Sequence, residues 1–179
     1  MGKVQSIVLV RWVADREIVV CGLLNRMSRA PKIKKFFVLV SWIGDGKAWY
    51  SLMVALPLIY GEKGLATSWN MVIVGIVNLA LYKAVKNLTG RPRPDVVSKE
   101  ICLGTAPLDQ YSFPSGHTMH AVAFSMIAGA HHAELSRVLI PASSLIALSR
   151  VVLGLHYHPT DVIAGGLIGG YVASWLLAS

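Results

Sequence analysis

The chain has 179 residues, a length that suits one domain. Only 15% of its residues are charged and 54% are hydrophobic, whereas soluble domains carry about 25% charged residues, so the composition excludes a soluble globular domain. The net charge of +8 could indicate a nucleic-acid-binding protein. The chain offers no soluble module for such a surface, however, and basic residues beside anionic lipid headgroups explain the charge better.

The first 35 residues predict a helix and a basic turn that lie in the membrane interface. Residues 4–24 alternate apolar and charged positions at roughly helical spacing, which is typical of an amphipathic interfacial helix. The turn that follows carries five basic residues: Arg26, Arg29, Lys32, Lys34 and Lys35. We therefore assign residues 1–35 to an interfacial segment and residues 36–179 to a transmembrane domain.

Apolar segments follow in blocks that suit transmembrane helices. A helix needs ~20 predominantly apolar residues to cross a bilayer, and the 19 residues between Lys63 and Lys83 contain no charged side chain. A Gly-Asp-Gly-Lys break at 44–47 indicates a hinge before the first span, and "GEKG" a tight turn after it. We predict five spans, at about 44–60, 65–86, 114–131, 136–155 and 160–178. The predicted fold is all-α, a multi-pass bundle of about five transmembrane helices preceded by the interfacial helix.

The last of these spans is rich in small residues. It contains two overlapping pairs, Gly165-x-x-x-Gly169 and Gly166-x-x-x-Gly170. Small residues at this spacing let helices approach closely in lipid, so we interpret both pairs as helix-packing positions.

Short turns between the spans force neighbouring helices to alternate in direction. The end of the second span, the loop over 87–112, the start of the third span and the end of the fourth therefore share one side of the membrane. This topology gathers nine polar residues on that side: Lys86, Arg91, Arg93, Ser115, His117, Arg150, His156, His158 and Asp161.

Arg150 is the most informative member of this group. It interrupts an apolar segment, where a lone charge costs ~2.5–3.5 kcal/mol on insertion scales. Arg150 could extend to the interface or pair with Asp161, but the same side holds three other cations and few acids. A bound anion is the favoured explanation, and phosphate matches both the fork of Arg and the point charge of Lys.

The sequence Pro114-Ser115-Gly116-His117 predicts a helix start that would bind such an anion. A helix N-terminus presents free backbone N–H groups and the positive end of its dipole. Gly116 lets the backbone come close to the anion, Ser115 adds a hydroxyl donor, and His117 is placed to protonate a leaving oxygen. A second histidine followed by an acid, "HYHPTD", supplies an imidazole held in one tautomer, as a nucleophilic histidine requires. The pattern indicates phosphoryl transfer to histidine followed by hydrolysis.

Three motifs, in order, resemble those of the type-2 phosphatidic-acid phosphatase superfamily of membrane lipid phosphatases. The signature K-x6-R-P matches "KNLTGRPRP", P-S-G-H matches residues 114–117, and S-R-x5-H-x3-D resembles "SRVVLGLHYHPTD". The resemblance covers the chain from about Gly44 to its end. It implies that Lys86, Arg93 and Arg150 bind the phosphate. It also implies that His117 is the general acid, His156 the nucleophile and Asp161 its orienting partner.

One departure from the family pattern concerns the third motif. The family places three residues between the histidine and the aspartate, whereas four separate His156 from Asp161. Either His156 keeps the nucleophilic role across a one-residue bulge, or His158 takes it; the spacing from Arg150 favours His156. Arg91 is a further candidate for contact with the headgroup or for a surface role. His120, one turn into the third span, is interpreted as a packing residue.

We therefore expect a phosphatase that needs neither metal nor cofactor and that acts on a lipid substrate in the bilayer, without nucleic acid. Candidate substrates are phosphatidic acid, phosphatidylglycerol phosphate, undecaprenyl diphosphate and a lipid A phosphate. The alternatives are an anion-binding membrane transporter and a lipid-binding relative with weak catalysis. The resemblance implies a bacterial inner membrane with the site on the periplasmic face, whereas the excess of Lys and Arg on the active-site side favours the cytoplasm.

Overall fold

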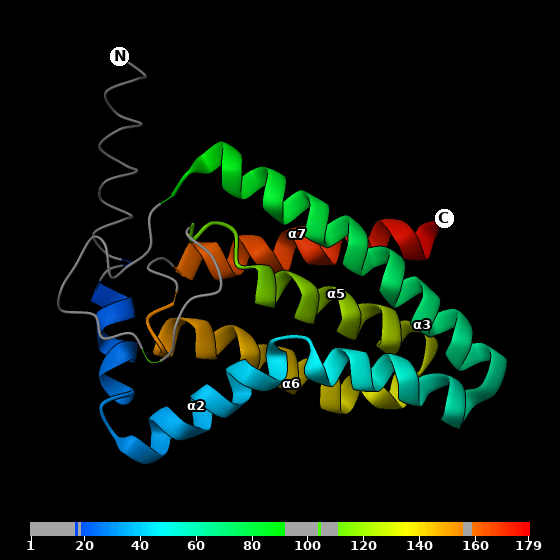
Figure 1. Cartoon of the computed structure of the whole chain (residues 1–179), viewed down its shortest axis with the longest axis horizontal. Helices are drawn as coiled ribbons and strands as arrows, with labels where there is room; N and C mark the ends of the chain where they lie inside the picture. The colour runs from blue at the N-terminus through cyan, green and yellow to red at the C-terminus, as the bar shows by residue number, and fades with distance from the viewer. Residues whose placement is uncertain (1–16, 18, 92–103, 105–110, 156–158) are drawn as a thin grey trace.

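The structure, a computed structural model, describes residues 17, 19–91, 104, 111–155 and 159–179. Its helices are α2 (Pro31–Gly44), α3 (Lys47–Thr89), α5 (Gly116–His131), α6 (Ala133–Val152) and α7 (Pro159–Ala178), with a short helix over 19–27 before them. The described residues contain no strand, and the long helices form an elongated bundle (Figure 1). The predicted all-α class is confirmed.

Helix α3 consists of two arms joined by a sharp reversal at Gly61. Gly61 has φ 59° and ψ −133°, a backbone conformation that glycine adopts readily because it has no Cβ. The tight turn predicted at "GEKG" is therefore present, and the second arm runs back along the bundle (Figure 1). That arm continues past its predicted end at Lys86 to Thr89, where Gly90 in the left-handed conformation caps it.

Helix α5 is the central helix and packs against α3, α6 and α7. Its buried face is apolar, and the Phe124 ring lies 5.4 Å from the Trp49 ring of α3, centroid to centroid. A Cβ on Gly169 of α7 would stand 2.1 Å from the carbonyl oxygen of Met119 in α5, so this contact requires glycine. A Cβ on Gly166 or Gly170 would lie at an ordinary contact distance from side chains of α5. Of the two predicted glycine pairs, only Gly165 and Gly169 lie against backbone carbonyls, those of Ser115 and Met119.

The boundaries of α6 and α5 also differ from those expected. The fourth span was predicted over 136–155, but α6 ends at Val152 because Gly154, with φ 68°, turns the chain just beyond it. Helix α5 begins at Gly116, with Ser115 as its N-cap residue in an extended conformation, rather than near Pro114.

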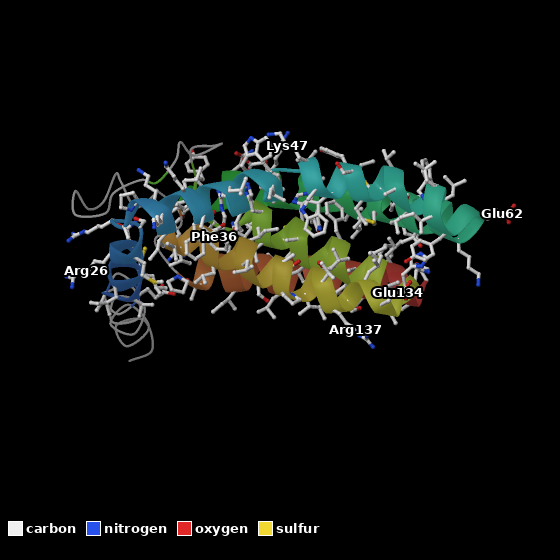
Figure 2. The ribbon with its side chains drawn as sticks, turned by 90° about the horizontal axis from the view of Figure 1, so that it is seen from below. Arg26, Phe36, Lys47, Glu62, Glu134 and Arg137 are labelled. Carbon is white, nitrogen blue, oxygen red and sulfur yellow. The ribbon has the colours of Figure 1, made fainter. Side chains whose placement is uncertain are left out.

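Three of the described helices are long and apolar enough to cross a membrane: α3, α6 and α7. Helix α5 is shorter, at 16 residues. Large apolar side chains such as Leu58, Leu167 and Tyr171 are exposed on the outside of the bundle, as expected for a surface that faces lipid tails. Figure 2 shows charged side chains at the two ends of the long axis, with Arg26 at one end and Glu62 at the other.

The short helix over 19–27 packs on the bundle at the end where α6 finishes and α7 begins. Cys21 is buried beside Val151, and the Asn25 side-chain amide donates a 3.1 Å hydrogen bond to the carbonyl of Val152. The Glu17 carboxylate accepts a 2.9 Å hydrogen bond from the backbone N–H of Thr160. Most of the predicted amphipathic helix, residues 4–16 and 18, lies outside the described residues, and the division at residue 35 stays a prediction.

Candidate active site

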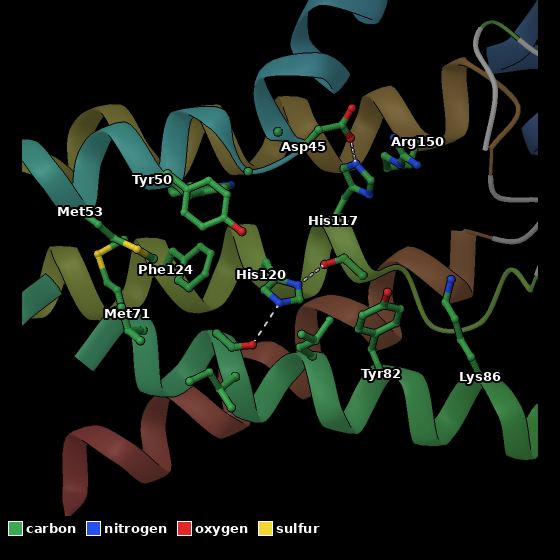
Figure 3. Close-up of a pocket in the computed structure, with 18 residues that line it drawn as sticks. Asp45, Tyr50, Met53, Met71, Tyr82, Lys86, His117, His120, Phe124 and Arg150 are labelled. Carbon is green, nitrogen blue, oxygen red and sulfur yellow. Dashed lines mark hydrogen bonds and ion pairs between the residues drawn. The ribbon is translucent and has the colours of Figure 1, made fainter. Parts of the chain in front are cut away.

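A cavity of about 360 Å³ lies between the α2–α3 turn, both arms of α3, and helices α5 and α6. Lys86, Gly116, His117 and Arg150, four of the residues predicted to form the site, line it (Figure 3). They come from three helices that are far apart in the sequence. These segments thus meet at one cavity, as the predicted helix directions require, and their common side of the membrane stays a prediction.

The rest of the cavity wall is largely apolar. It is formed by side chains that include Trp49, Met53, Met71, Ile76, Leu79 and Phe124. His120 lies on this wall one helical turn from His117, with Nδ1 2.8 Å from the Gly116 carbonyl and Nε2 3.3 Å from the Gly75 carbonyl. The second of these contacts joins α5 to the second arm of α3. The cavity therefore has a charged end beside His117 and an apolar end beyond His120.

His117, in the first turn of α5, contacts the carboxylate of Asp45. Nε2 of His117 contacts Oδ1 of Asp45, which lies in the turn between α2 and α3. The His117 side chain is 11% exposed and the Asp45 side chain 29%. Burial raises the pKa of the Asp45 carboxyl, but the hydrogen bond to His117 and the positive charges of His117, Arg150 and Lys47 outweigh that effect, so the pKa lies below its usual value. Asp45 is therefore ionised at neutral pH.

Arg150, near the end of α6, is buried with only 3% of its surface exposed. Its Nη1 donates a 2.6 Å hydrogen bond to the hydroxyl of Ser41 in α2. Asp161, the alternative partner considered for Arg150, pairs with Arg91. Arg150 thus presents a buried positive charge at the cavity, held by a neutral partner from another helix.

Lys86, on the second arm of α3, supplies a second cation. It is 5% exposed, and its Nζ donates a 2.9 Å hydrogen bond to the carbonyl oxygen of Tyr111. The same ammonium group lies 5.3 Å from the centre of the Tyr82 ring. These contacts direct the long side chain along the helix toward the start of α5, where the cavity is charged (Figure 3).

The start of α5 is fixed by contacts to α7. The backbone N–H of Ser115 donates a 2.9 Å hydrogen bond to the Asp161 carbonyl oxygen, and Met119 N–H donates to the Ser115 carbonyl. The Ser115 hydroxyl is fully buried and lies 3.0 Å from the Thr118 hydroxyl. The sequence placed this hydroxyl among the phosphate donors. In the structure it is engaged within the first turn of α5, whereas Gly116 lines the cavity.

Asp161, in the first turn of α7, is completely buried and pairs with Arg91. Arg91 Nη1 lies 2.6 Å from Asp161 Oδ1, and the Arg91 side chain is 31% exposed. Arg91 is therefore attached to the residue that was expected to orient the nucleophile. Arg93, His156 and His158 lie outside the described residues, so their predicted roles stay predictions.

Sequence reasoning missed two members of this site, Asp45 and Ser41. The Gly-Asp-Gly-Lys break was interpreted only as a hinge. A carboxylate flanked by glycines at a membrane-facing turn was the available signal for Asp45. Ser41 is one hydroxyl in an apolar helix, and its contact with Arg150 spans 109 positions, which no local pattern encodes. Among the described residues, no group of three or more His, Cys, Asp or Glu side chains is arranged to hold a metal ion.

Comparison with known proteins gives one family and several relatives. The family model of the PAP2 superfamily matches residues 65–179. A decaprenylphosphoryl-5-phosphoribose phosphatase of Mycobacterium tuberculosis is 36% identical over 96 residues, which are 53% of this chain and 51% of that protein. The chain thus spans about half the length of this relative. A lipid A 1-phosphatase of Rhizobium etli is 27% identical over 80% of this chain and 69% of its own length.

Among solved structures, Aquifex aeolicus LpxE resembles the chain with a TM-score of 0.74 and 25% identity. The superposition covers 88% of this chain and 93% of LpxE. Together with the long apolar helices, these similarities identify an integral membrane protein.

Proposed function

This chain belongs to the PAP2 superfamily, and on that premise we propose that it is a membrane phosphatase that hydrolyses a phosphomonoester or diphosphate on a lipid headgroup. The observation that supports this most strongly is the two-part cavity. Its charged end holds Lys86, His117 and Arg150, and its other walls are apolar. An amphiphile with a phosphate at one end and a hydrocarbon chain at the other matches both parts.

The chemistry begins with the phosphate in the charged end of the cavity. The Arg150 guanidinium and the Lys86 ammonium stabilise the negative charge on the phosphoryl oxygens, together with the backbone N–H groups at the start of α5. Arg93 is assigned to the same task from its position in the first motif. Because Lys86 and Arg150 are almost fully buried, their attraction to an anion is screened less than at an exposed site.

Bond exchange then proceeds in two steps. The His156 imidazole attacks phosphorus while the bond from phosphorus to the lipid oxygen breaks, and His117 gives a proton to that departing oxygen. Water next attacks the phosphohistidine, His117 takes a proton from the water, and the nitrogen–phosphorus bond breaks to release inorganic phosphate. Asp161 is assigned to orient His156, with Arg91 holding the Asp161 carboxylate in place.

The substrate class is a phosphorylated lipid. The two relatives named above act, by their names, on a polyprenyl-linked phosphate and on lipid A, and we extend that range to this chain. The full chain in phospholipid vesicles is to be assayed for released phosphate with phosphatidic acid, phosphatidylglycerol phosphate, undecaprenyl diphosphate and a lipid A phosphate. Hydrolysis of at least one is expected. No release from any of them, together with movement of phosphate across the vesicle wall, would establish an anion transporter instead.

For the cellular location, we propose the inner membrane of a bacterium with the cavity on the periplasmic face, as the family resemblance implies. The basic residues oppose this orientation, because Lys- and Arg-rich loops usually stay in the cytoplasm. Five of them, however, belong to the segment over 26–35, which we assign to the membrane interface rather than to a loop between two spans.

A further inference from the structure

Asp45 is the one carboxylate among the described residues that line the cavity. It lies 72 positions before His117 in the sequence and reaches the His117 ring from a different helix pair (Figure 3). None of the three family motifs includes it. It is therefore a member of the site for which the family pattern supplies no role.

The turn that carries Asp45 is well packed, so the carboxylate is held at a defined place. A Cβ on Gly44 would stand 3.1 Å from the Ile146 side chain of α6, which leaves no room for a larger residue without displacement. Gly46 has φ 107°, and its carbonyl accepts a 2.8 Å hydrogen bond from the N–H of Tyr50 at the start of α3. Asp45 N–H donates to the Trp42 carbonyl. Backbone hydrogen bonds thus connect the turn to both α2 and α3.

The cavity that His117 lines also holds charged and titratable groups from each element around it. They are Asp45 from the α2–α3 turn, Arg150 from α6, His120 from α5, and Tyr50, Tyr82 and Lys86 from α3. The Asp45 carboxylate contacts Nε2 of His117, and an adjacent opposite charge favours the charged form of an ionisable group. A general acid must carry its proton before the leaving oxygen departs.

We propose that Asp45 is a positioning residue for the leaving-group step. Its carboxylate accepts a hydrogen bond from Nε2–H of His117, fixes the ring and stabilises its protonated form. This inference rests on the proposed function, in which His117 is the general acid.

That contact determines which nitrogen of His117 transfers its proton. Because Asp45 occupies Nε2, the proton on Nδ1 is the one that moves to the lipid oxygen as the phosphorus–oxygen bond breaks. Neutral His117 then keeps Nε2–H on Asp45, and its free Nδ1 receives a proton from the attacking water in the second step. Asp45 stays ionised throughout.

The test uses the full chain in vesicles and the variants Asp45→Asn, Asp45→Glu and, as a matched control, Glu62→Gln. Glu62 is an exposed carboxylate at the far end of the molecule (Figure 2). In Asp45→Asn we expect kcat for a lipid substrate to fall at least ~10-fold, since general acid catalysis typically supplies 10²–10⁴-fold. The fall of activity at high pH should begin about one pH unit lower, because an opposite charge near an ionisable group moves its titration by about 1–3 units.

Two further readouts separate positioning from a merely structural role. A nitrophenyl phosphate ester has a good leaving group that needs little protonation, so Asp45→Asn should affect its turnover much less than that of the lipid. Asp45→Glu should restore part of the lost rate, and Glu62→Gln should match the unaltered protein. An unshifted pH profile with equal losses for both substrates would overturn the proposal. A gain in activity would overturn it too, because the carboxylate would then be obstructing the cavity.

A measurement without turnover distinguishes failure of this inference from failure of the proposed function. The histidine NMR signals of the labelled full chain in detergent are titrated, and the signal lost in His117→Ala is assigned to His117. Asp45→Asn should move that titration to lower pH. If it does not move, Asp45 does not stabilise the protonated ring. If it moves and no lipid phosphate is hydrolysed, the proposed function fails while the Asp45–His117 interaction stands.

Discussion

The guanidinium of Arg91 lies 2.6 Å from the carboxylate of Asp161, with Asp161 fully buried and Arg91 partly exposed. The contact joins the chain just beyond α3 to the first turn of α7. Removing one partner of a buried pair leaves the other charge without its counter-ion, which costs more than removing both. The positive charge of Arg91 therefore stabilises the negative charge of the buried Asp161 carboxylate.

Arg91→Met should lower the unfolding temperature in detergent more than Arg137→Met, a control at an exposed arginine far from the cavity. Adding Asp161→Asn to Arg91→Met should cost less than the sum of the two single changes. The coupling should amount to about 0.5–3 kcal/mol, the usual range for residues in direct contact. Strict additivity would show that the pair contributes nothing to stability.

The glycines of α7 allow a sharper test of packing, because two neighbours differ in their surroundings. Gly169→Ala should destabilise the protein, since a Cβ there meets the Met119 carbonyl at 2.1 Å and forces α5 and α7 apart. Gly170→Ala is the matched control, because its Cβ would lie 3.5 Å from the Met126 sulfur, an ordinary contact. Thermal unfolding of both variants in detergent measures the difference. Equal stability of the two would contradict the close approach of these helices.

The sequence predicted the helical class, the order of the helices and the "GEKG" reversal because these depend on local composition and on turn residues. It also brought Lys86, His117 and Arg150 together, because alternating helix direction is enough to place them on one side. It could not supply the Asp45–His117 or Arg150–Ser41 contacts, which depend on how α2 packs against α6 and on where the α2–α3 turn meets α5. The predicted end of α6 was three residues too late because the turn at Gly154 was not recognised.

Similarly, the small-residue motif did not indicate which side of α7 packs against α5. Both glycine pairs in α7 have the same spacing, yet only Gly165 and Gly169 face the backbone of α5. Helix rotation is determined by the whole packed interface, and a repeated pattern of identical residues carries no information about it.

The orientation of the protein in the membrane can be measured at the C-terminus, which lies at the end of α7 away from the start of α5 (Figure 1). If the cavity opens to the periplasm, a reporter fused after Ser179 should lie in the cytoplasm and give the cytoplasmic signal. A fusion in the α2–α3 turn, beside the cavity, should give the opposite signal. A periplasmic signal from Ser179 would mean that the basic residues determine the orientation.

Activity should survive EDTA. Lys86 and Arg150 already supply positive charge at the cavity, and Asp45 is its one carboxylate among the described lining residues, so no set of oxygen ligands for Mg²⁺ is evident there. Vanadate should inhibit, because it resembles the transferring phosphoryl group. Phosphate release is measured with EDTA alone and after Mg²⁺ is added back. Loss of activity that Mg²⁺ restores would contradict metal independence.

The central claim is that this protein hydrolyses a lipid phosphate through His156. The most direct test measures phosphate release by three proteins reconstituted in lipid vesicles: the unaltered chain, His156→Ala and His158→Ala. We expect the unaltered chain and His158→Ala to release phosphate from the same lipid, and His156→Ala to release none, because no nucleophile then attacks phosphorus. Release by His156→Ala at the unaltered rate, or none by the unaltered chain from any of the four lipids, would contradict the proposed reaction.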